Sequence, residues 1–323
     1  MKRPIALISI ALVAALLGAC TPSTGGLGPI GSAPPSAEPS VPVGSPDLTP
    51  APSSPGSSPG ASPGETPDPS SPTTGSSVVR AYFFLSGEQG SEGLVPVLRE
   101  IPATQAVARA AMSALLAGPL GAELQATPAI TSAVPGGTRL LGLSITNGIA
   151  TVDLSREFEA GGGSRSAFGR LAQVVYTLTQ FPTVRSVVFQ VEGRTVTVFG
   201  SEGIVLDGPI GRDYPTFEDF LPAIFVDRPA WGAAIGNPAQ VTGSANVFEA
   251  SFLITLFDAS GDELFGGPVM ATSGSGTRGT FEVSIPYVVD QGQWGVLRVW
   301  NASAMDGSPE DIREYPVWLT PAG

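Results

Sequence analysis

The stretch Val78-Val79-Arg80-Ala81-Tyr82-Phe83-Phe84-Leu85 marks the start of the folded part of this chain. It is rich in β-branched and aromatic residues, which is typical of a buried strand. Residues 94–101 form a second predicted strand. Pro96 places that strand at a sheet edge, because proline cannot donate a ladder hydrogen bond. The chain is therefore expected to fold from about residue 78 onward.

Helix and hairpin signals follow in alternation. Thr104 can cap a helix that runs to about Leu116 and ends at Gly118-Pro119. Its predicted apolar face consists of Val107, Ala110, Ala111, Ala114 and Leu115. Further on, Asn147-Gly148 suits the turn of a two-residue hairpin. The remaining predicted strands lie at residues 138–146, 149–154, 185–191 and 195–199. A second helix is predicted to start at Ser164 or Ser166 and to stop at Phe181-Pro182. This order predicts an α+β domain, with two helices on one face of a mixed sheet.

The sequence pattern changes after a short acidic connector at residues 208–220. Seven short predicted strands follow, separated by turns, at residues 224–228, 239–244, 250–257, 263–270, 278–285, 294–301 and 313–319. This spacing is typical of an immunoglobulin-like sandwich. The ring of Phe248, where a turn meets a strand, is expected to be buried. The other predicted core residues are Phe252, Ile254, Leu256, Val283, Trp294, Leu297, Val299 and Trp300.

Four motifs of the first folded region resemble the GerMN domain, which is named for a sporulation and spore germination protein. They are Leu115-Leu116-Ala117-Gly118-Pro119, Val134-Pro135-Gly136-Gly137-Thr138, Ala150-Thr151-Val152-Asp153-Leu154-Ser155 and Val175-Tyr176-Thr177-Leu178-Thr179-Gln180-Phe181-Pro182. The resemblance implies a domain over residues 78–207 without catalytic residues. It also implies a role in assembling envelope complexes, and the domain occurs in other exported bacterial lipoproteins.

Three motifs of the second region resemble the Gmad-type immunoglobulin-like domain of bacterial spore germination proteins. They are Phe225-Val226-Asp227-Arg228-Pro229, Val241-Thr242-Gly243-Ser244-Ala245-Asn246-Val247-Phe248-Glu249-Ala250 and Ser303-Ala304-Met305-Asp306-Gly307-Ser308. The implied domain occupies residues 221–323. A GerMN domain followed by this domain is itself a familiar pairing.

The N-terminus carries an export signal. Lys2 and Arg3 precede an apolar run from Ile5 to Leu17, as in a secretory signal peptide. The signal ends in Leu17-Gly18-Ala19-Cys20, which resembles the bacterial lipoprotein pattern; a plain signal peptide is the alternative. Residues 1–20 are thus predicted to be the signal, with the lipid attached to Cys20. Residues 21–77 consist mostly of Pro, Ser, Gly, Thr and Ala and are predicted to be a disordered linker.

Composition excludes several classes of function. The chain has a formal net charge of -12, and its only lysine, Lys2, lies in the signal. Nucleic acid is therefore not an expected partner, because binding phosphates requires clustered basic residues. The sequence contains no histidine, and its single cysteine is assigned to the lipid. Ser-His-Asp triads, thiol nucleophiles and His- or Cys-ligated metals are excluded, and no catalytic, cofactor or metal site is expected.

Three groups of residues invite a chemical role, and each has a simpler interpretation. Asp153 and Glu157 could act as an acid–base pair, but capping a turn and facing solvent is the favoured interpretation. Gly161-Gly162-Gly163 could cradle an anion, but a connector is favoured. Two acidic stretches could hold calcium, although loop carboxylates are more often only solvated. They consist of Asp258, Asp262 and Glu263, and of Asp306, Glu310, Asp311 and Glu314.

The sequence thus predicts a non-enzymatic lipoprotein that mediates protein–protein assembly with other envelope proteins. The expected location is the outer face of the cytoplasmic membrane, to which the lipid on Cys20 would hold it. The alternative is a module that binds cell-wall glycan or peptide. In that case some aromatic side chains would stack on sugars: Trp231, Tyr287, Trp294 and Trp300. These aromatics are more often core residues, so their exposure separates the two interpretations.

Overall fold

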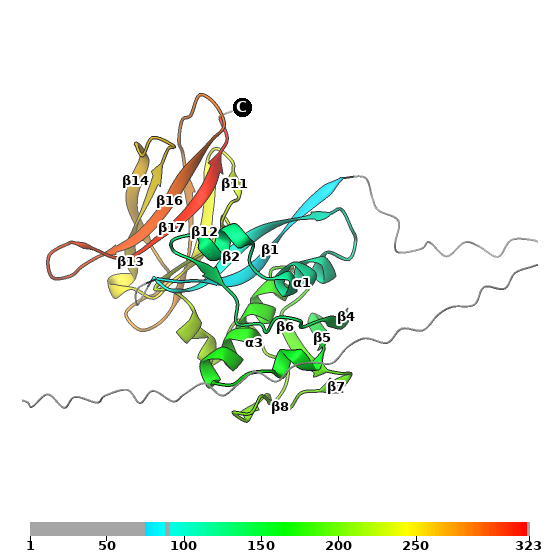
Figure 1. Cartoon of the computed structure of the whole chain (residues 1–323). Helices are drawn as coiled ribbons and strands as arrows, with labels where there is room; N and C mark the ends of the chain where they lie inside the picture. Colours follow the sequence, from blue (N-terminus) through cyan, green and yellow to red (C-terminus); the bar gives the residue numbers. More distant parts are fainter. Residues whose placement is uncertain (1–74, 88–90, 322–323) are drawn as a thin grey trace, which may run out of the picture. The chain divides into compact units, whose positions relative to one another are not determined.

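The structure is a computed structural model that describes residues 75–87 and 91–321. The predicted signal peptide, Cys20 and nearly all of the predicted linker lie outside the described residues. Figure 1 follows the chain through its elements. Among the described residues, no helix is both long enough and apolar enough to cross a membrane.

Strand β1 (Ser76–Leu85) is the centre of the first sheet. It pairs antiparallel with β2 (Gly93–Pro102) along its whole length and with β3 (Ile130–Thr131) at its end, in the order β2-β1-β3. The strand begins two residues before the predicted position. Its middle, from Arg80 to Phe83, is buried on both faces. That burial agrees with the continuous apolar run that the sequence shows.

A second sheet has the order β4-β5-β6-β7. Its strands are β4 (Leu140–Thr146), β5 (Ile149–Leu154), β6 (Ser186–Val191) and β7 (Arg194–Thr195). The predicted Asn147-Gly148 turn is present, with φ angles of 53° and 85°. β5 and β6 are parallel, so this sheet is mixed. The predicted strand 195–199 is divided between β7 and a small hairpin of β8 (Val198–Phe199) and β9 (Ile204–Val205), and Phe199 is buried.

Helices pack against these sheets. They are α1 (Val107–Ala117), α2 (Gly121–Gln125), α3 (Ser164–Leu178) and the short 3-10 helix η1 (Arg156–Glu159). α3 begins at one of the two predicted serines. α1 begins three residues after Thr104, whose hydroxyl accepts a hydrogen bond from the Ala106 N–H. The predicted apolar face was partly wrong, because packing against α3 and β1 covers a neighbouring face of the helix: the buried residues are Ala108, Ala111, Met112 and Leu115.

All seven strands predicted for the second region are present. They form two sheets, β10-β12-β15 and β11-β17-β16-β13-β14. The first consists of β10 (Ile224–Arg228), β12 (Ala239–Ala245) and β15 (Gly279–Ile285). The second consists of β11 (Ala234–Ile235), β13 (Ser251–Phe257), β14 (Glu263–Met270), β16 (Gln293–Ala302) and β17 (Pro309–Leu319). The immunoglobulin-like sandwich and the α+β class of the first domain are confirmed. The single sheet predicted for the first domain was wrong, because its strands are divided between the β2-β1-β3 and β4-β5-β6-β7 sheets and the β8-β9 hairpin.

The predicted core of the sandwich needs two corrections. Phe248 is 62% exposed, because it lies in the 3-10 turn η3 (Phe248–Ala250) just before β13. Trp294 is 52% exposed, because β16 directs Leu297 and Val299 inward and every second residue outward. Val283 and Trp300 are half-buried. The remaining predicted core residues are buried as expected: Phe252, Ile254, Leu256, Leu297 and Val299.

The two domains share their interior. The predicted connector contains the 3-10 helix η2 (Pro215–Phe220), whose Phe217 and Phe220 are buried. The outer edge of β2 receives Trp231 of the second domain. The Trp231 N–H donates to the Pro96 carbonyl at 2.8 Å, and the Leu98 N–H donates to the Trp231 carbonyl at 3.1 Å. Buried apolar residues from Ala81 to Leu319 form one contiguous cluster.

Candidate functional site: the joint between the two domains

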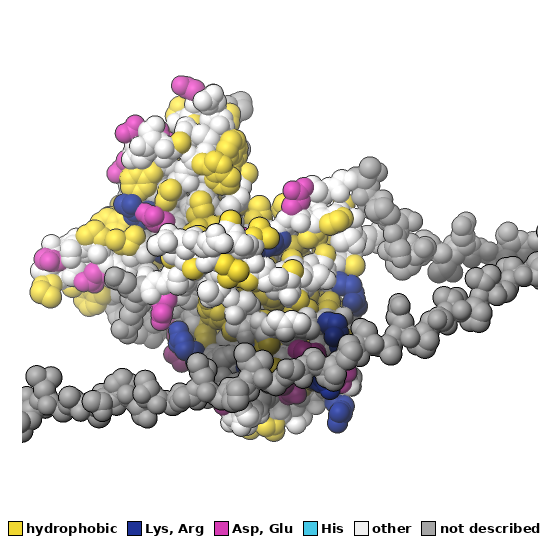
Figure 2. Space-filling view, in the orientation of Figure 1, with side chains coloured by type: hydrophobic (Ala, Val, Ile, Leu, Met, Phe, Trp, Pro, Cys, Tyr) yellow, Lys and Arg dark blue, Asp and Glu magenta, His cyan; other side chains and the backbone are white. Residues whose placement is uncertain are grey.

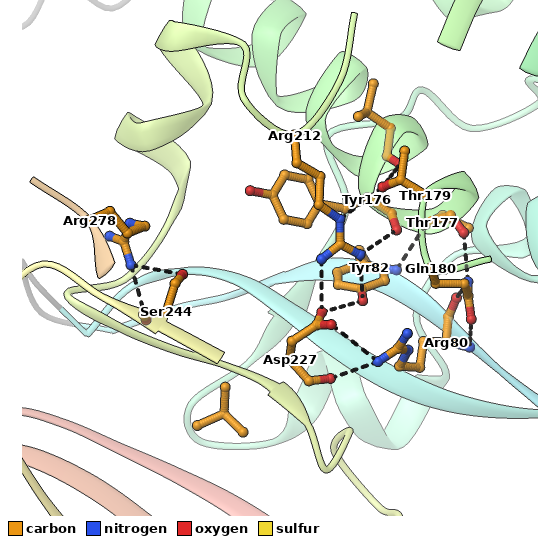
Figure 3. Close-up of polar contacts among 12 residues, drawn as sticks. Arg80, Tyr82, Tyr176, Thr177, Thr179, Gln180, Arg212, Asp227, Ser244 and Arg278 are labelled. Atoms are coloured by element: carbon orange, nitrogen blue, oxygen red, sulfur yellow. Dashed lines mark hydrogen bonds and ion pairs between the residues drawn. The ribbon is translucent and has the colours of Figure 1, made fainter. Parts of the chain in front are cut away.

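Polar side chains from four segments meet where the domains join (Figure 3). β1 contributes Arg80 and Tyr82, and the end of α3 contributes Tyr176. Arg212 precedes η2, and Asp227 lies on β10. Asp227 is the only one of these five residues that belongs to the second domain. Its carboxylate therefore connects that domain to the other four side chains.

The Asp227 carboxylate is contacted on both oxygens. The Tyr82 hydroxyl donates to Oδ1 at 2.5 Å, and the Arg212 guanidinium lies 3.3 Å from the same oxygen. Arg80 lies 3.3 Å from Oδ2 and also donates to the Asp227 backbone carbonyl at 3.0 Å. A hydrogen bond of 3.1 Å from Arg212 to the Tyr82 hydroxyl closes the arrangement. Two guanidinium groups and one phenol therefore contact the same carboxylate.

Side chains of α3 and its C-terminal end hold β1 in place beneath this network. Thr177 accepts from the Tyr82 N–H at 3.1 Å, and Gln173 donates to the Tyr82 carbonyl at 2.8 Å. Gln180 accepts from the Arg80 N–H at 2.9 Å and donates to the Arg80 carbonyl at 2.6 Å. These side chains supply the hydrogen bonds that a neighbouring strand would otherwise make. The buried backbone N–H and C=O groups of Arg80 and Tyr82 therefore all have partners.

Burial and charge together shift the pKa values of the network. Burial alone would raise the pKa of Asp227, but Arg212 and Arg80 outweigh it and hold that pKa below its usual value. Burial, with the Asp227 charge nearby, raises the pKa of Tyr82. Burial also raises the pKa of Tyr176 to about 12. The Arg212 guanidinium lies over the Tyr176 ring at 4.5 Å, a cation–π contact.

This chemistry suits a structural joint. The Asp227 carboxylate is ionised and occupied on both oxygens, and the Tyr82 phenol stays protonated, so neither is poised to move a proton at neutral pH. Arg212 also donates to the Thr179 hydroxyl at 2.8 Å and the Tyr176 carbonyl at 3.2 Å. Every charged member of the network is thus bound to another part of the protein.

Arg313 makes a second polar contact across the joint. This β17 side chain is 2% exposed and donates to the carbonyls of Ser91, Gly93 and Leu94 in the first domain, at 2.8, 3.4 and 2.5 Å. Burial lowers the pKa of its guanidinium. Three carbonyl acceptors partly offset the cost of burying this charge.

Asp153 and Glu157, considered above as a possible acid–base pair, do not form one. Asp153 accepts a hydrogen bond from the Gly193 N–H in the turn after β6, at 2.9 Å. Ser155 is buried and accepts from the Arg139 N–H. Glu157 lies 3.6 Å from the exposed Arg156, and its pKa is lowered, chiefly by the Ser155 hydroxyl. The turn-capping interpretation of Asp153 is the one that the geometry supports.

The glycine run and the acidic loops are engaged within the chain as well. The Gly163 N–H at the start of α3 donates to the Glu202 carboxylate at 2.5 Å, where an anion would have to sit. Asp258 accepts from the N–H groups of Ser260 and Asp262, and Glu314 pairs with Arg298 at 2.6 Å. In the part of the chain that the structure describes, no cluster of three potential metal ligands from His, Cys, Asp and Glu occurs.

The four aromatic residues considered for sugar stacking differ in their exposure to solvent. Tyr287 is buried and donates to the carbonyls of Ile235 and Thr320. Trp231 and Trp300 are half-buried. Trp294 is exposed and packs edge-to-face on Trp318, with 5.4 Å between ring centroids.

That tryptophan pair belongs to a largely apolar outer sheet face. In Figure 2, hydrophobic side chains gather over β13, β16 and β17, and the Arg298–Glu314 ion pair lies on the same strands. The outward residues on these strands include Leu253, Phe257, Trp294, Val296, Trp300, Pro316 and Trp318.

Sequence reasoning did not anticipate the joint. In the sequence, Asp227 stands within a family motif, and Arg80 stands within a predicted strand. The available signal was a charged residue within an otherwise apolar strand, since such a charge requires a partner when it is buried. Arg212, in a loop, gave no comparable signal, and nothing in the sequence indicates that these residues meet.

Comparisons with known proteins match both parts of the chain. A family model described as "Sporulation and spore germination" (Germane) matches residues 80–197. A model described as "Immunoglobulin-like domain of bacterial spore germination" (Gmad2) matches residues 223–308. The order is the one that the sequence motifs predicted. Comparison with curated proteins gave no match.

Three solved structures are similar to parts of the chain. A candidate lipoprotein from Clostridium perfringens has 19% identity and a TM-score of 0.30, over 45% of this chain and 93% of its own. The first GerMN domain of the sporulation protein GerM from Bacillus subtilis has 18% identity and a TM-score of 0.35, over 42% and 98%. The tandem GerMN domains of GerM have 15% identity and a TM-score of 0.35, over 59% of each chain.

Proposed function

Since this chain combines a Germane domain with a Gmad2 immunoglobulin-like domain, we propose that it is a non-enzymatic envelope protein acting in a sporulation- or germination-like process. Its action would be to bind other envelope proteins and assemble them. Cys20 would carry a lipid that holds the protein at the outer face of the cytoplasmic membrane. Residues 21–77 would tether the folded body, and their Pro/Ser/Gly-rich composition suits this role.

The observation that carries this proposal is the joint. Asp227, whose pKa is lowered by Arg212 and Arg80, pairs with Arg212, and this contact joins the second domain to the first. In an enzyme, such groups usually face a substrate. Here they produce a rigid two-domain body whose outer surfaces remain available to a partner.

Open strand edges are the surfaces that suit protein recognition. In the described structure, β4, β14 and β15 each lie at the end of a sheet. An edge strand can accept an extended segment of another protein through main-chain hydrogen bonds, without any catalytic group. β4, with the sequence Leu-Leu-Gly-Leu-Ser-Ile-Thr, contains no charge or proline that would oppose such pairing.

The test combines anchoring with capture. Changing Cys20 to Ser should release the protein from the membrane fraction, and the wild-type lipoprotein should resist a high-salt wash. Chemical crosslinking in intact cells should join the wild-type protein to a specific set of envelope proteins. A Cys20→Ser protein that stays in the membrane fraction would contradict the anchor, and the absence of specific crosslinks would contradict the assembly role.

A second candidate function, binding of cell-wall glycan, is favoured by the Trp294–Trp318 pair. Two indole rings at the surface, 52% and 36% exposed, can stack on the apolar faces of sugars. We expect Trp294→Ala to abolish cosedimentation with purified cell walls if this function holds. Val288→Ala, at another exposed apolar residue, is the control. Equal sedimentation of both variants and wild type would reject glycan binding at this pair.

A further inference from the structure

A groove of about 1070 Å³ lies beside the joint. One wall comes from the first domain and η2, with Tyr176, residues 212–215 and Glu218. The other wall is formed by β10, β12, β15 and the loop before β15. The groove is thus larger than a typical small-molecule pocket and exists only because the two domains are held together.

The floor of the groove is aromatic and its rims are polar. Tyr176 and Phe225 meet edge-to-face, with 5.8 Å between ring centroids, and both are almost fully buried. Tyr214 is half-buried and packs on Phe217 at 5.1 Å. Thr242, Ser244 and Thr280 supply hydroxyl groups along the second wall. The half-buried Tyr214 ring can pack against the stem of a long side chain, and the hydroxyl groups can hydrogen-bond its polar end.

The charges in the groove are unbalanced. Arg212 is paired with Asp227, and Arg278 is paired with Glu218 at 2.8 Å while also donating to the Pro222 carbonyl. Two further carboxylates, Asp213 and Glu282, line the groove and are exposed. Neither makes an ion pair within the described residues. The groove therefore presents two free negative charges and lacks a free positive one in the described structure.

The wider field has the same sign. Residues 221–323 contain eleven Asp and Glu residues but only four arginines, which gives this domain a formal charge of -7. Of these arginines, Arg278 and Arg298 are paired with glutamates, and Arg313 is buried. A negatively charged domain attracts cationic ligands over distances of about a Debye length. Basic segments of a partner protein should therefore be attracted to the second domain.

The edge of β15 adds a backbone feature. Thr280 exchanges hydrogen bonds with Thr272, away from β12. Because backbone groups alternate along a strand, Glu282 and Ser284 direct their N–H and C=O groups to this same outer edge. There β15 has no strand partner among the described residues. An extended polypeptide can therefore pair with β15 where the groove opens.

We infer that this groove binds an extended, arginine- or lysine-bearing segment of a partner protein. The basic side chains would lie against Asp213 and Glu282, and the segment's backbone along the β15 edge. This inference rests on the proposed function and assigns it a location and a chemistry. An acidic partner segment is disfavoured by the same charges.

The test uses the full-length chain in detergent with two fluorescent peptides of equal length. One alternates arginine with threonine, and the other alternates glutamate with threonine. The basic peptide should bind saturably, and the acidic peptide should not. The double variant Asp213→Asn/Glu282→Gln should bind the basic peptide about tenfold more weakly, since it loses both free charges. Equal affinity for the two peptides would overturn the inference.

A matched control separates the groove from the general negative charge. The variant Asp290→Asn/Glu310→Gln removes the same number of exposed charges elsewhere on the second domain. It should bind like wild type, and an equal loss in both double variants would overturn the inference. A photo-crosslinker at Thr280 should label the basic peptide, whereas one at Val205 should not. If groove variants bind normally while specific envelope crosslinks persist, the proposed function stands and this site is wrong.

Discussion

At the scale of the residue, Asp227 connects the second domain to three polar side chains of the first domain and the connector. A buried ion pair contributes little net stability compared with a well-packed apolar group, because both charges must lose water. Removing one partner is different, since the other charges are then left buried without compensation. Arg80, Arg212 and Tyr82 all contact the Asp227 carboxylate, so its loss removes the only carboxylate partner of two guanidinium groups and one phenol among the described residues.

We expect Asp227→Ala to lower the free energy of unfolding by about 3 kcal/mol, the cost of leaving buried charges unpaired. Denaturant unfolding of the full chain measures this. Asp213→Ala, an exposed carboxylate nearby, is the control and should change stability by less than about 0.5 kcal/mol. Similar values for both variants would show that the network does not stabilise the fold.

The same carboxyl predicts a dependence on pH. The folded pKa of Asp227 lies below its usual value, so the unfolded chain takes up this proton first as the pH falls. The stabilisation is therefore complete above about pH 4 and is lost as the pH falls through the folded pKa. Below pH 4, wild type should lose stability more steeply than Asp227→Asn. Parallel pH profiles of the two proteins would contradict this assignment.

Phe248 and Phe252 are close in the sequence but differ in burial, so the same substitution at each position compares a surface ring with a core ring. Phe248 is 62% exposed, whereas Phe252 is fully buried and packs edge-to-face on Phe281 at 4.8 Å. We expect Phe252→Ala to cost about 3–5 kcal/mol of unfolding free energy and Phe248→Ala less than about 1 kcal/mol. Chemical denaturation of both variants measures these free energies of unfolding. A large loss of unfolding free energy for Phe248→Ala would contradict the exposed position of that ring.

At the scale of the element, β2 explains how the domains come to share a sheet edge. Pro96 identified this strand as an edge from the sequence, and within its own sheet that is correct. The exposed backbone groups are not left to solvent, because Trp231 pairs with Pro96 and Leu98. An edge that would invite association is thus covered from within the chain.

Hydrogen exchange should report this contact. The Leu98 and Trp231 amides bond across the joint, so they should be protected in the wild-type protein to the level of the core strands. In Asp227→Ala these two amides should exchange faster, while the Leu256 and Val299 amides inside the sandwich change little. Uniform acceleration of all four amides would mean that the joint has no stability of its own.

At the scale of the whole molecule, the described residues behave as one packing unit. The buried apolar cluster runs through both domains, and Arg313 of the second domain depends on three carbonyls of the first. If either domain unfolded alone, this guanidinium and the Asp227 network would lose their partners. Separation of the domains is therefore costly.

We expect the full chain to unfold in a single calorimetric transition, with equal calorimetric and van't Hoff enthalpies. Two separated transitions would show that the domains are energetically independent. Asp227→Ala should broaden or split the transition, because it weakens the joint without emptying either core. Phe252→Ala, the control, should lower the transition temperature and keep one transition.

Local pattern determined much of the fold. The sequence predicts the seven strands of the sandwich and the Asn147-Gly148 turn, and it limits the start of α3 to Ser164 or Ser166. Alternation, turn residues and apolar spacing act over a few neighbouring positions, so they can be read directly from the chain. The domain families were accessible for a related reason, since their motifs are contiguous stretches.

The joint and the groove were decided only by the tertiary structure. Tyr82 and Asp227 are 145 positions apart, and Arg313 and Leu94 are 219 apart. No local periodicity specifies which distant partner a buried charge will meet. The exposure of Phe248 and Trp294 has the same origin, because strand alternation gives two faces but only packing decides which one is covered. Sequence therefore supplied the elements, and the long-range desolvation of a few charged groups fixed how the two domains meet.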